Sequence, residues 1–284
     1  MLKSLLGIAP MREPDGSFRP SKVALKFSTS ETSDFDAVAY TPYEGKRKKI
    51  LVIFTERKNM TMQNGTEFST GNHPVEALVP MLHLRDAGFE FEVTTPTGKP
   101  VAFEMWAMPR ADAAVMGMYE ELKPRLEHPR ALSEFVRDFL GTLESYAAVF
   151  VPGGHGAMLG LPEDRNVGTI LRAAQQNDLF TISLCHGPGS FLATMLDGEE
   201  FLYRGYEMGV FPDSVDKMTP MIGYLPGHMP WRLAEKLQSL GAEVVNTKAD
   251  DTCHIDRKLI TGASPLASDA LGRLAATTLL EQLG

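Results

Sequence analysis

The sequence is poor in cysteine: Cys185 and Cys253 are its two cysteines in 284 residues. A framework of disulfides needs more of them, so the two thiols are expected to be free in a reducing compartment, which predicts a cytoplasmic protein. No apolar stretch approaches the ~20 residues that cross a bilayer. The first ten residues carry too short an apolar run for a signal peptide. We therefore expect no membrane partner.

Positive charge is also in short supply. Lysine and arginine total 28 against 36 aspartates and glutamates, which gives a net charge of -8. Because phosphate contacts need clustered lysines and arginines, this balance argues against a nucleic-acid-binding surface. The one basic run, Lys46-Arg47-Lys48-Lys49, precedes an apolar strand, where solvated charges deter edge pairing.

What the chain does contain is an alternation of apolar strands and helical patterns. The predicted strands cover residues 49–54, 89–94, 146–151, 179–184, 242–246 and 258–261. The predicted helices cover residues 74–87, 131–143, 166–177 and 230–240, and a last helix opens at Ser264-Pro265. Such alternation is typical of βαβ units. It predicts an α/β fold whose mostly parallel sheet is sandwiched by helices.

The pattern also suggests how the chain is divided. Residues 1–46 have several prolines and no sustained period, and we predict an extension that is draped over the domain or partly mobile. Residues 47–284 are predicted to form one α/β domain. Within it, residues 95–130 fit neither period and are predicted to be a small inserted helical subdomain.

Cys185 is the first candidate for chemistry. An apolar strand leads directly into it, and the run His186-Gly187-Pro188-Gly189-Ser190 and an apolar helix follow. In open α/β sheets ligands bind at the carboxyl ends of strands, and a sharp strand-to-helix turn there exposes a nucleophile. A thiol at a helix N-terminus also meets free N–H groups, which favour the thiolate. We therefore predict that Cys185 is an ionised nucleophile.

A glycine turn ends another strand. In Pro152-Gly153-Gly154-His155-Gly156, consecutive glycines allow backbone N–H groups to face an anion without obstruction by Cβ atoms. The N–H groups of Gly153 and Gly154, with that of His186, are predicted to form an oxyanion hole beside the thiol. His155 is expected either to line the pocket or to support it by a hydrogen bond.

Together these two turns resemble those of the ThiJ/PfpI superfamily, which is related to the class I glutamine amidotransferase fold and is flavodoxin-like. Further runs look like the bacterial heat-shock chaperone and glyoxalase III (HchA) type within that superfamily. The resemblance extends from about residue 40 to the C-terminus. The runs that carry it are Thr70-Gly71-Asn72-His73-Pro74-Val75-Glu76, residues 87–92, Trp106-Ala107-Met108-Pro109, Phe211-Pro212-Asp213, Pro226-Gly227-His228 and residues 256–259.

The resemblance implies partners for the thiol that spacing does not supply. The family's catalytic Cys-His-Asp set falls on Cys185, His186 and Asp216, and its acidic residue beside the thiol falls on Glu76. Asp213, three positions before Asp216, is the competing acid, and its other interpretation is a loop or cap residue. An imidazole oriented by a carboxylate can relay protons, which makes these roles chemically coherent.

The chain departs from its relatives at the metal site that the resemblance implies. The ligand positions of that site correspond here to Arg85, Glu90 and Leu122. Arginine is no metal ligand and leucine offers no donor atom. We therefore expect that metal site to be missing, and no cofactor is predicted. The dipeptide Cys253-His254 lacks both the preceding apolar strand and the following glycine, and we predict a loop thiol there.

The resulting hypothesis is a glutathione-independent glyoxalase that converts methylglyoxal to lactate, or a deglycase of early glycation adducts. Both activities begin with attack of one thiol on one small carbonyl, so the sequence does not separate them. A second hypothesis is a stress-induced holding chaperone for unfolded proteins, and a third is a small cysteine peptidase or amidase. The resemblance also implies a homodimer.

Overall fold

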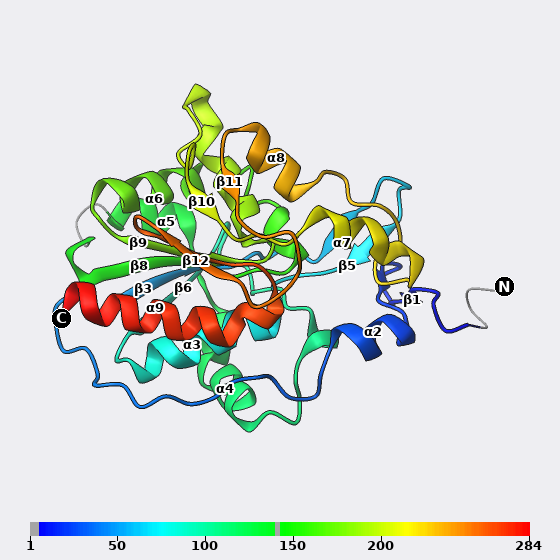
Figure 1. The fold of residues 1–284 in the computed structure, drawn as a ribbon, viewed down its shortest axis with the longest axis horizontal. Helices are drawn as coiled ribbons and strands as arrows, with labels where there is room; N and C mark the ends of the chain where they lie inside the picture. Colours follow the sequence, from blue (N-terminus) through cyan, green and yellow to red (C-terminus); the bar gives the residue numbers. More distant parts are fainter. Residues whose placement is uncertain (1–5, 140–142) are drawn as a thin grey trace.

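A seven-stranded sheet crosses the computed structural model, which describes residues 6–139 and 143–284 (Figure 1). Its strand order is β12-β13-β9-β8-β3-β6-β7. β12 is antiparallel to β13, and the other neighbours are parallel. This confirms the predicted fold class. The strands are β12 (Cys253–Asp256), β13 (Leu259–Gly262), β9 (Phe180–Leu184), β8 (Tyr146–Val151), β3 (Lys49–Ile53), β6 (Glu90–Thr95) and β7 (Arg130–Ala131).

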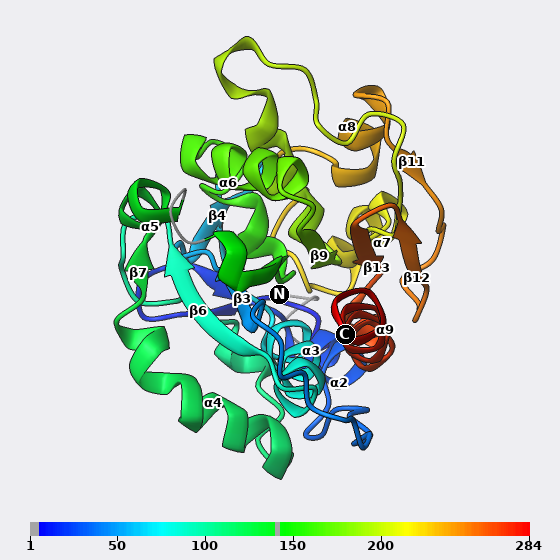
Figure 2. The same cartoon turned by 90° about the vertical axis from the view of Figure 1, so that its left-hand side faces the viewer.

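Helices cover both faces of this sheet (Figure 2). Successive side chains of a strand point to opposite faces, so Ile50 and Val52 join one core while Leu51 and Ile53 join the other. The continuous apolar runs in the sequence reflect this double burial. The first core is covered by α3 (Pro74–Asp86), α4 (Ala113–Glu127) and α9 (Ser268–Leu283), and the second by α5 (Leu132–Phe139), α6 (Arg165–Gln176) and η4 (Gly187–Gly198).

The predicted elements of the main sheet are close to those observed. The strand predicted at residues 146–151 has the same bounds as β8, and the helix predicted at residues 74–87 ends one residue earlier as α3. The helix predicted at residues 131–143 corresponds to α5 and a short turn, η2 (Leu143–Ser145), while residues 140–142 lie outside the described residues. The last helix opens as predicted, with the Ser264 side chain accepting from the Leu266 N–H before η6 (Pro265–Ala267).

The first part of the chain is more ordered than its irregular pattern indicates. Of residues 1–46, residues 1–5 lie outside the described residues, and the rest contain β1 (Met11–Arg12), β2 (Phe18–Arg19) and α2 (Lys22–Ser28). β2 pairs with β5 (Glu67–Ser69), which pairs with β4 (Asn59–Thr61). The extension is therefore attached to the domain through a second, four-stranded sheet.

Residues 95–130 contain one short turn, η1 (Met105–Ala107), and the helix α4. Asp112 caps α4 by accepting from the N–H groups of Ala114 and Val115. The buried side chains of α4, among them Met118 and Leu122, pack in the same core as α3. The division into extension, domain and inserted subdomain stays a prediction.

The remaining elements lie beyond η4 or at strand ends. They are η3 (His155–Met158), β10 (Glu207–Met208), α7 (Asp213–Met218), η5 (Thr219–Met221), α8 (Leu233–Ser239) and β11 (Glu243–Val244). Among the described helices, none combines the length and the apolar character needed to cross a membrane.

Truncation of a fully buried side chain of the central strand should be costly. We expect Phe150→Ala to lower the free energy of unfolding by about 3–5 kcal/mol, because Phe150 is fully buried in β8 and its loss leaves a cavity. Urea unfolding followed by circular dichroism measures this value. Met221→Ala is the control, since its side chain is 71% exposed and its loss should cost less than about 0.5 kcal/mol. Equal effects in both variants would contradict the assignment of the core.

Candidate active site

Cys185 lies in a sharp turn between β9 and η4. Its φ of 58° is in the left-handed region, which costs a residue other than glycine about 1–3 kcal/mol. Hydrogen bonds hold the turn: the Cys185 N–H donates to the carbonyl of Gly262, and the Phe211 N–H donates to the carbonyl of Cys185. Gly187 is required here, because a Cβ atom at this position would lie 2.3 Å from Oγ of Ser183. The turn has the form of the predicted nucleophile elbow.

His186 and Asp216 are joined to the thiol in a line. Sγ of Cys185 lies 3.3 Å from Nδ1 of His186, and Nε2 of His186 lies 2.8 Å from Oδ2 of Asp216. Burial opposes ionisation of Asp216, but the two histidines beside it hold the pKa of its carboxyl well below the ordinary value. The carboxylate accepts the Nε2–H proton, so Nδ1 keeps a lone pair that faces the thiol. This arrangement can take the thiol proton.

A second imidazole shares the same carboxylate. Nε2 of His155 lies 2.9 Å from Oδ1 of Asp216, and the rings of His155 and His186 are 4.0 Å apart. Burial and the neighbouring His155 together lower the pKa of His186. Burial also opposes protonation of His155, yet Asp216 raises its pKa above the ordinary value. Of the two rings, His186 is therefore the one kept neutral as a base. His155 contacts Asp216 and lines the cavity as well.

Glu76 lies beside the thiol, in the first turn of α3. It is almost fully buried, and its carboxyl interacts with the Cys185 thiol and with the Gly154 N–H. Burial raises the pKa of Glu76 well above its ordinary value, and the charge of Glu104 raises it further. The protonated carboxyl can donate a hydrogen bond to a thiolate.

The pKa of Cys185 corrects a prediction. The turn favours the thiolate through the Gly154 N–H, but burial and the charge of Glu76 outweigh it and raise the pKa of the thiol well above the ordinary value. The expectation that the elbow alone ionises Cys185 is wrong in direction, because it left out burial (Cys185 is 2% exposed). Ionisation here requires a group that takes the proton, and Nδ1 of His186 is in reach.

The glycine turn packs closely under the thiol. Gly154 has a φ of 95° and lines the cavity, with its N–H directed at the thiol and at Glu76. A Cβ atom on Gly153 would lie 1.9 Å from Oε2 of Glu76 and 2.8 Å from Cβ of Cys185. The Gly153 carbonyl accepts from the N–H of His73. Glycine is thus required at both positions. Gly154 is the one of the two that meets the cavity.

Cys185 opens into a cavity of ≈ 320 Å³, which suits a small molecule. Its walls come from stretches that lie far apart in the chain. Beyond the predicted site residues, the structure adds Glu104, Tyr224 and, from α2, Phe27 and Ser28. No sequence pattern marks these residues, although Glu104 lies two positions before one of the runs that carry the family resemblance. The cavity is also lined by His73, Phe211, Val215, Thr219, Ile222, Ala249, Ser264, Pro265 and Leu266.

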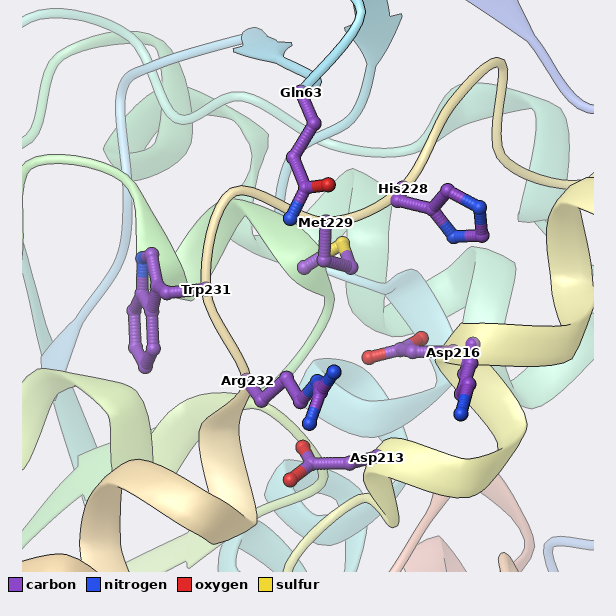
Figure 3. A pocket seen from close by; sticks show the side chains of 8 residues that line it. Gln63, Asp213, Asp216, His228, Met229, Trp231 and Arg232 are labelled. Carbon is purple, nitrogen blue, oxygen red and sulfur yellow. The ribbon is translucent and has the colours of Figure 1, made fainter.

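Asp213, the competing acid, has another role. Its two carboxylate oxygens accept from the N–H groups of Ala234 and Glu235, at 3.0 and 2.8 Å, and so cap the first turn of α8. Figure 3 shows Asp213 and Asp216 in a second hollow of ≈ 230 Å³, where the Asp213 carboxylate lies near Arg232. Asp216 lines both hollows.

The metal positions of the resemblance do not fit a metal. Arg85 pairs with Asp86 and Glu121, and Leu122 is fully buried among apolar side chains. In residues 6–139 and 143–284, the group of potential ligand atoms close enough for an ion is that of His155, His186 and Asp216. Those atoms already bond one another, and we expect no resident metal there.

Cys253 differs from its predicted setting. It lies on β12 rather than in a loop, because its segment pairs with β13 along the edge of the sheet. Its Sγ contacts the carbonyl of Asp251 at 3.6 Å. Burial and the charge of Asp251 raise the pKa of this thiol to about 12, which keeps it protonated at neutral pH.

Known proteins resemble the chain over nearly its whole length, although no family model matches it. Protein/nucleic acid deglycase HchA of Pseudomonas aeruginosa strain UCBPP-PA14 is 48% identical over 276 residues, which are 96% of this chain and 94% of that protein. Protein/nucleic acid deglycase 1 of Escherichia coli strain K12 is 48% identical over 267 residues, 94% of this chain and 93% of that protein.

Solved structures with lower identity share the fold. The crystal structure of glyoxalase III from Candida albicans has a TM-score of 0.62 at 20% identity, covering 81% of this chain and 98% of that one. A ThiJ/PfpI domain protein from Brachyspira murdochii has a TM-score of 0.51 at 12% identity, covering 84% and 100%. At these identities the likeness concerns the fold alone.

The coupling of Cys185 and Glu76 predicts how the thiol titrates. The rate of alkylation of Cys185 by iodoacetamide rises with pH as the thiol ionises. In a Cys253→Ser background, Glu76→Gln should shift the midpoint of this rise to lower pH by about one unit or more. The amide keeps a hydrogen-bond donor but cannot ionise, so it never carries the negative charge by which an ionised Glu76 raises the pKa of the thiol. Rates of alkylation between pH 6 and pH 10 measure the shift. Glu120→Gln, on an exposed part of α4, should leave the profile unchanged. A shift to higher pH in Glu76→Gln would contradict the coupling.

Proposed function

Because the chain belongs to the HchA family of protein/nucleic acid deglycases, within the ThiJ/PfpI superfamily, we propose that it acts on small reactive carbonyl compounds and on their early adducts. It is an enzyme, and Cys185 is the proposed nucleophile. The observation that carries this proposal is the 3.3 Å approach of Sγ to Nδ1 of His186 in a cavity of ≈ 320 Å³. Two activities follow from one attack: glutathione-independent conversion of methylglyoxal to lactate, and removal of early glycation adducts.

Attack begins with a proton transfer. His186 takes the thiol proton at Nδ1 while Asp216 holds Nε2–H and stabilises the imidazolium that forms. The thiolate adds to the aldehyde carbon and gives a hemithioacetal. The new oxyanion is held by the N–H of Gly154, with the N–H groups of Gly153 and His186 as further donors of the proposed oxyanion hole. Glu76, once protonated, supports the thiolate by a hydrogen bond.

The hemithioacetal then isomerises. His186 first gives the thiol proton to the oxyanion and becomes neutral again. It then removes the proton from the former aldehyde carbon and returns it to the neighbouring carbon, while the hydroxyl proton moves to the ketone oxygen, which converts the ketone to an alcohol and leaves a thioester. Water hydrolyses the thioester to lactate and frees Cys185. An early glycation adduct carries the same pair of oxygen-bearing carbons on a side-chain nitrogen, so attack by the thiol displaces the amine and joins the same path.

The alternatives fare differently. A peptidase needs an open cleft that admits an extended chain. Cys185 is 2% exposed in the wall of its cavity, which counts against peptide hydrolysis.

A holding chaperone is favoured by one observation. Phe27, Ile222 and Leu266 line the cavity and are exposed. Met218 and Met221, four residues and one residue before Ile222, also have exposed side chains. Such apolar surface suits unfolded clients.

The cellular compartment, the oligomeric state and the action on nucleic acids are also proposals. Residence in the cytoplasm agrees with the two free thiols, and a homodimer is what the family resemblance implies. The names of the relatives include nucleic acids among the substrates, whereas the net charge of -8 argues against a dedicated nucleic-acid-binding surface. A glycated nucleotide can be recognised at the cavity alone.

Loss of the thiol tests the proposal directly. Cys185→Ser should lower lactate formation from methylglyoxal, without glutathione, by at least ~10³-fold, because the hydroxyl is a far weaker nucleophile in this turn. An enzymatic lactate assay measures the rate. Cys253→Ser is the matched control and should retain the parent rate, since that thiol lies on β12, outside the cavity. Unchanged turnover in Cys185→Ser would overturn the proposal.

The two aspartates of α7 separate catalysis from stability. Asp216→Asn should lower kcat by about 10²–10⁴-fold, because the amide no longer fixes the tautomer of His186. Asp213→Asn should leave kcat within about threefold, since Asp213 caps α8, and it should lower the free energy of unfolding by about 0.5–1 kcal/mol. Kinetics and thermal melts on both variants give these values. The reverse pattern would assign the acid to Asp213.

A further inference from the structure

Glu104, a third buried carboxyl group, lines the same cavity as Cys185. It lies just before η1, and 1% of its surface is exposed. Its backbone N–H donates to the carbonyl of Asn72, and its Oε1 accepts from Oγ1 of Thr70 at 2.6 Å. The N–H of His155 is close enough to lower the pKa of its carboxyl. These bonds fix the side chain in the cavity wall.

The other carboxyl oxygen is left over. Among the residues that the structure describes, Oε2 of Glu104 has no hydrogen-bond partner. The bonds of Oε1 and of the backbone already anchor this segment. Anchoring therefore does not explain why Oε2 is buried without a partner. A buried polar atom without a partner is costly, and in native proteins it points to a missing ligand or a catalytic role. Glu104 shares the cavity with Cys185, which makes the substrate the natural partner.

We propose that Glu104 is a catalytic residue that binds and protonates the second oxygen of the substrate, the one on the carbon next to the aldehyde. This inference rests on the proposed glyoxalase chemistry and extends it. It defines the substrate class as aldehydes, or their thiol and amine adducts, that carry a carbonyl or hydroxyl oxygen on the adjacent carbon. The oxygen on the attacked carbon accepts a hydrogen bond from the N–H of Gly154 and keeps its own hydroxyl proton until the enediol forms.

The proton balance of the isomerisation requires such a group. When His186 removes the proton from the attacked carbon, the electron pair forms a double bond to the neighbouring carbon, and the ketone oxygen takes the Glu104 proton. The product is an enediol. His186 then returns its proton to the neighbouring carbon while the hydroxyl on the attacked carbon gives its proton back to Glu104. The thioester forms, and both residues regain their starting states.

The electrostatics agree with this role. Burial raises the pKa of Glu104 to about 7, against the opposing effects of His155 and Thr70. The titratable groups that share its cavity and interact with it are His155 of η3, Glu76 of α3 and Tyr224 beyond η5. The carboxyl is therefore protonated below about pH 7, and proton donation by Glu104 is lost as the pH rises through that value.

Protection of Cys185 from iodoacetamide, in the Cys253→Ser background, tests binding. Methylglyoxal and propanal both form hemithioacetals, but propanal has no second oxygen. The measured quantity is the ratio of the propanal concentration to the methylglyoxal concentration that gives equal protection. In the parent, this ratio should exceed the ratio found with a free thiol by at least ~10-fold, and we call this factor the excess protection. Glu104→Leu should abolish this excess and leave protection by propanal within about twofold, because the elbow itself is intact.

Glu104→Gln tests proton transfer. The amide can still donate to the second oxygen, so the excess protection by methylglyoxal should survive. Lactate formation should nevertheless fall by ~10²-fold or more, because the amide cannot give up its proton in the reaction. The decline in activity above about pH 7 should also disappear from the profile of the residual activity.

The outcomes separate the two proposals. If the parent makes no lactate, the glyoxalase function fails, while the protection ratio still decides whether Glu104 binds the second oxygen. If the parent makes lactate and Glu104→Gln keeps its rate within about threefold, the catalytic role of Glu104 is wrong. If Glu104→Leu fails to fold, the nearly isosteric glutamine variant decides. Retention of the full excess protection in a folded Glu104→Leu variant also overturns the inference.

Discussion

The buried carboxylate of Asp216 is the interaction on which the site depends. An isolated charge at this depth would be prohibitively costly, and two imidazoles make it tolerable by donating one hydrogen bond to each oxygen. That requirement orients His186 with its free nitrogen toward Cys185. The same requirement brings η3, the turn after β9 and α7 together at one end of the sheet. The hydrogen bonds that stabilise the charge of Asp216 therefore also orient His186 as a base.

Around that charge the site keeps its other acids neutral by burial. Cys185, Glu76 and Glu104 all lie in the cavity wall, and burial raises the pKa of each. A reaction that shuttles protons among them needs no net charge to enter or leave the cavity. The strained backbone at Cys185 and the two close-packed glycines are the local cost of holding these groups together.

Much of this arrangement could be predicted from the sequence because it is local. The run of apolar residues before Cys185 and the small residues after it specify a strand and a sharp turn, and β8 follows from six consecutive apolar residues. The pairing of Asp216 with His186 came from family resemblance, since thirty residues separate them. Glu104, Tyr224 and Phe27 could not be found, because what makes them site residues is a shared cavity and no local pattern marks them. The strands β1 and β2 escaped prediction because two residues are too few to show a period. The direction of the Cys185 pKa depends on burial, which only the folded chain determines.

The helix α9 offers a practical consequence for handling the molecule. It starts just after Pro265 and Leu266, in the wall of the cavity, and runs to the end of the chain at the far side of the molecule (Figure 1). Sixteen helical residues at 1.5 Å each carry the terminus about 24 Å away. A fluorophore, surface tether or purification tag attached there stays clear of the cavity. The α2 end of the chain, whose Phe27 lines the cavity, is the wrong end for immobilisation.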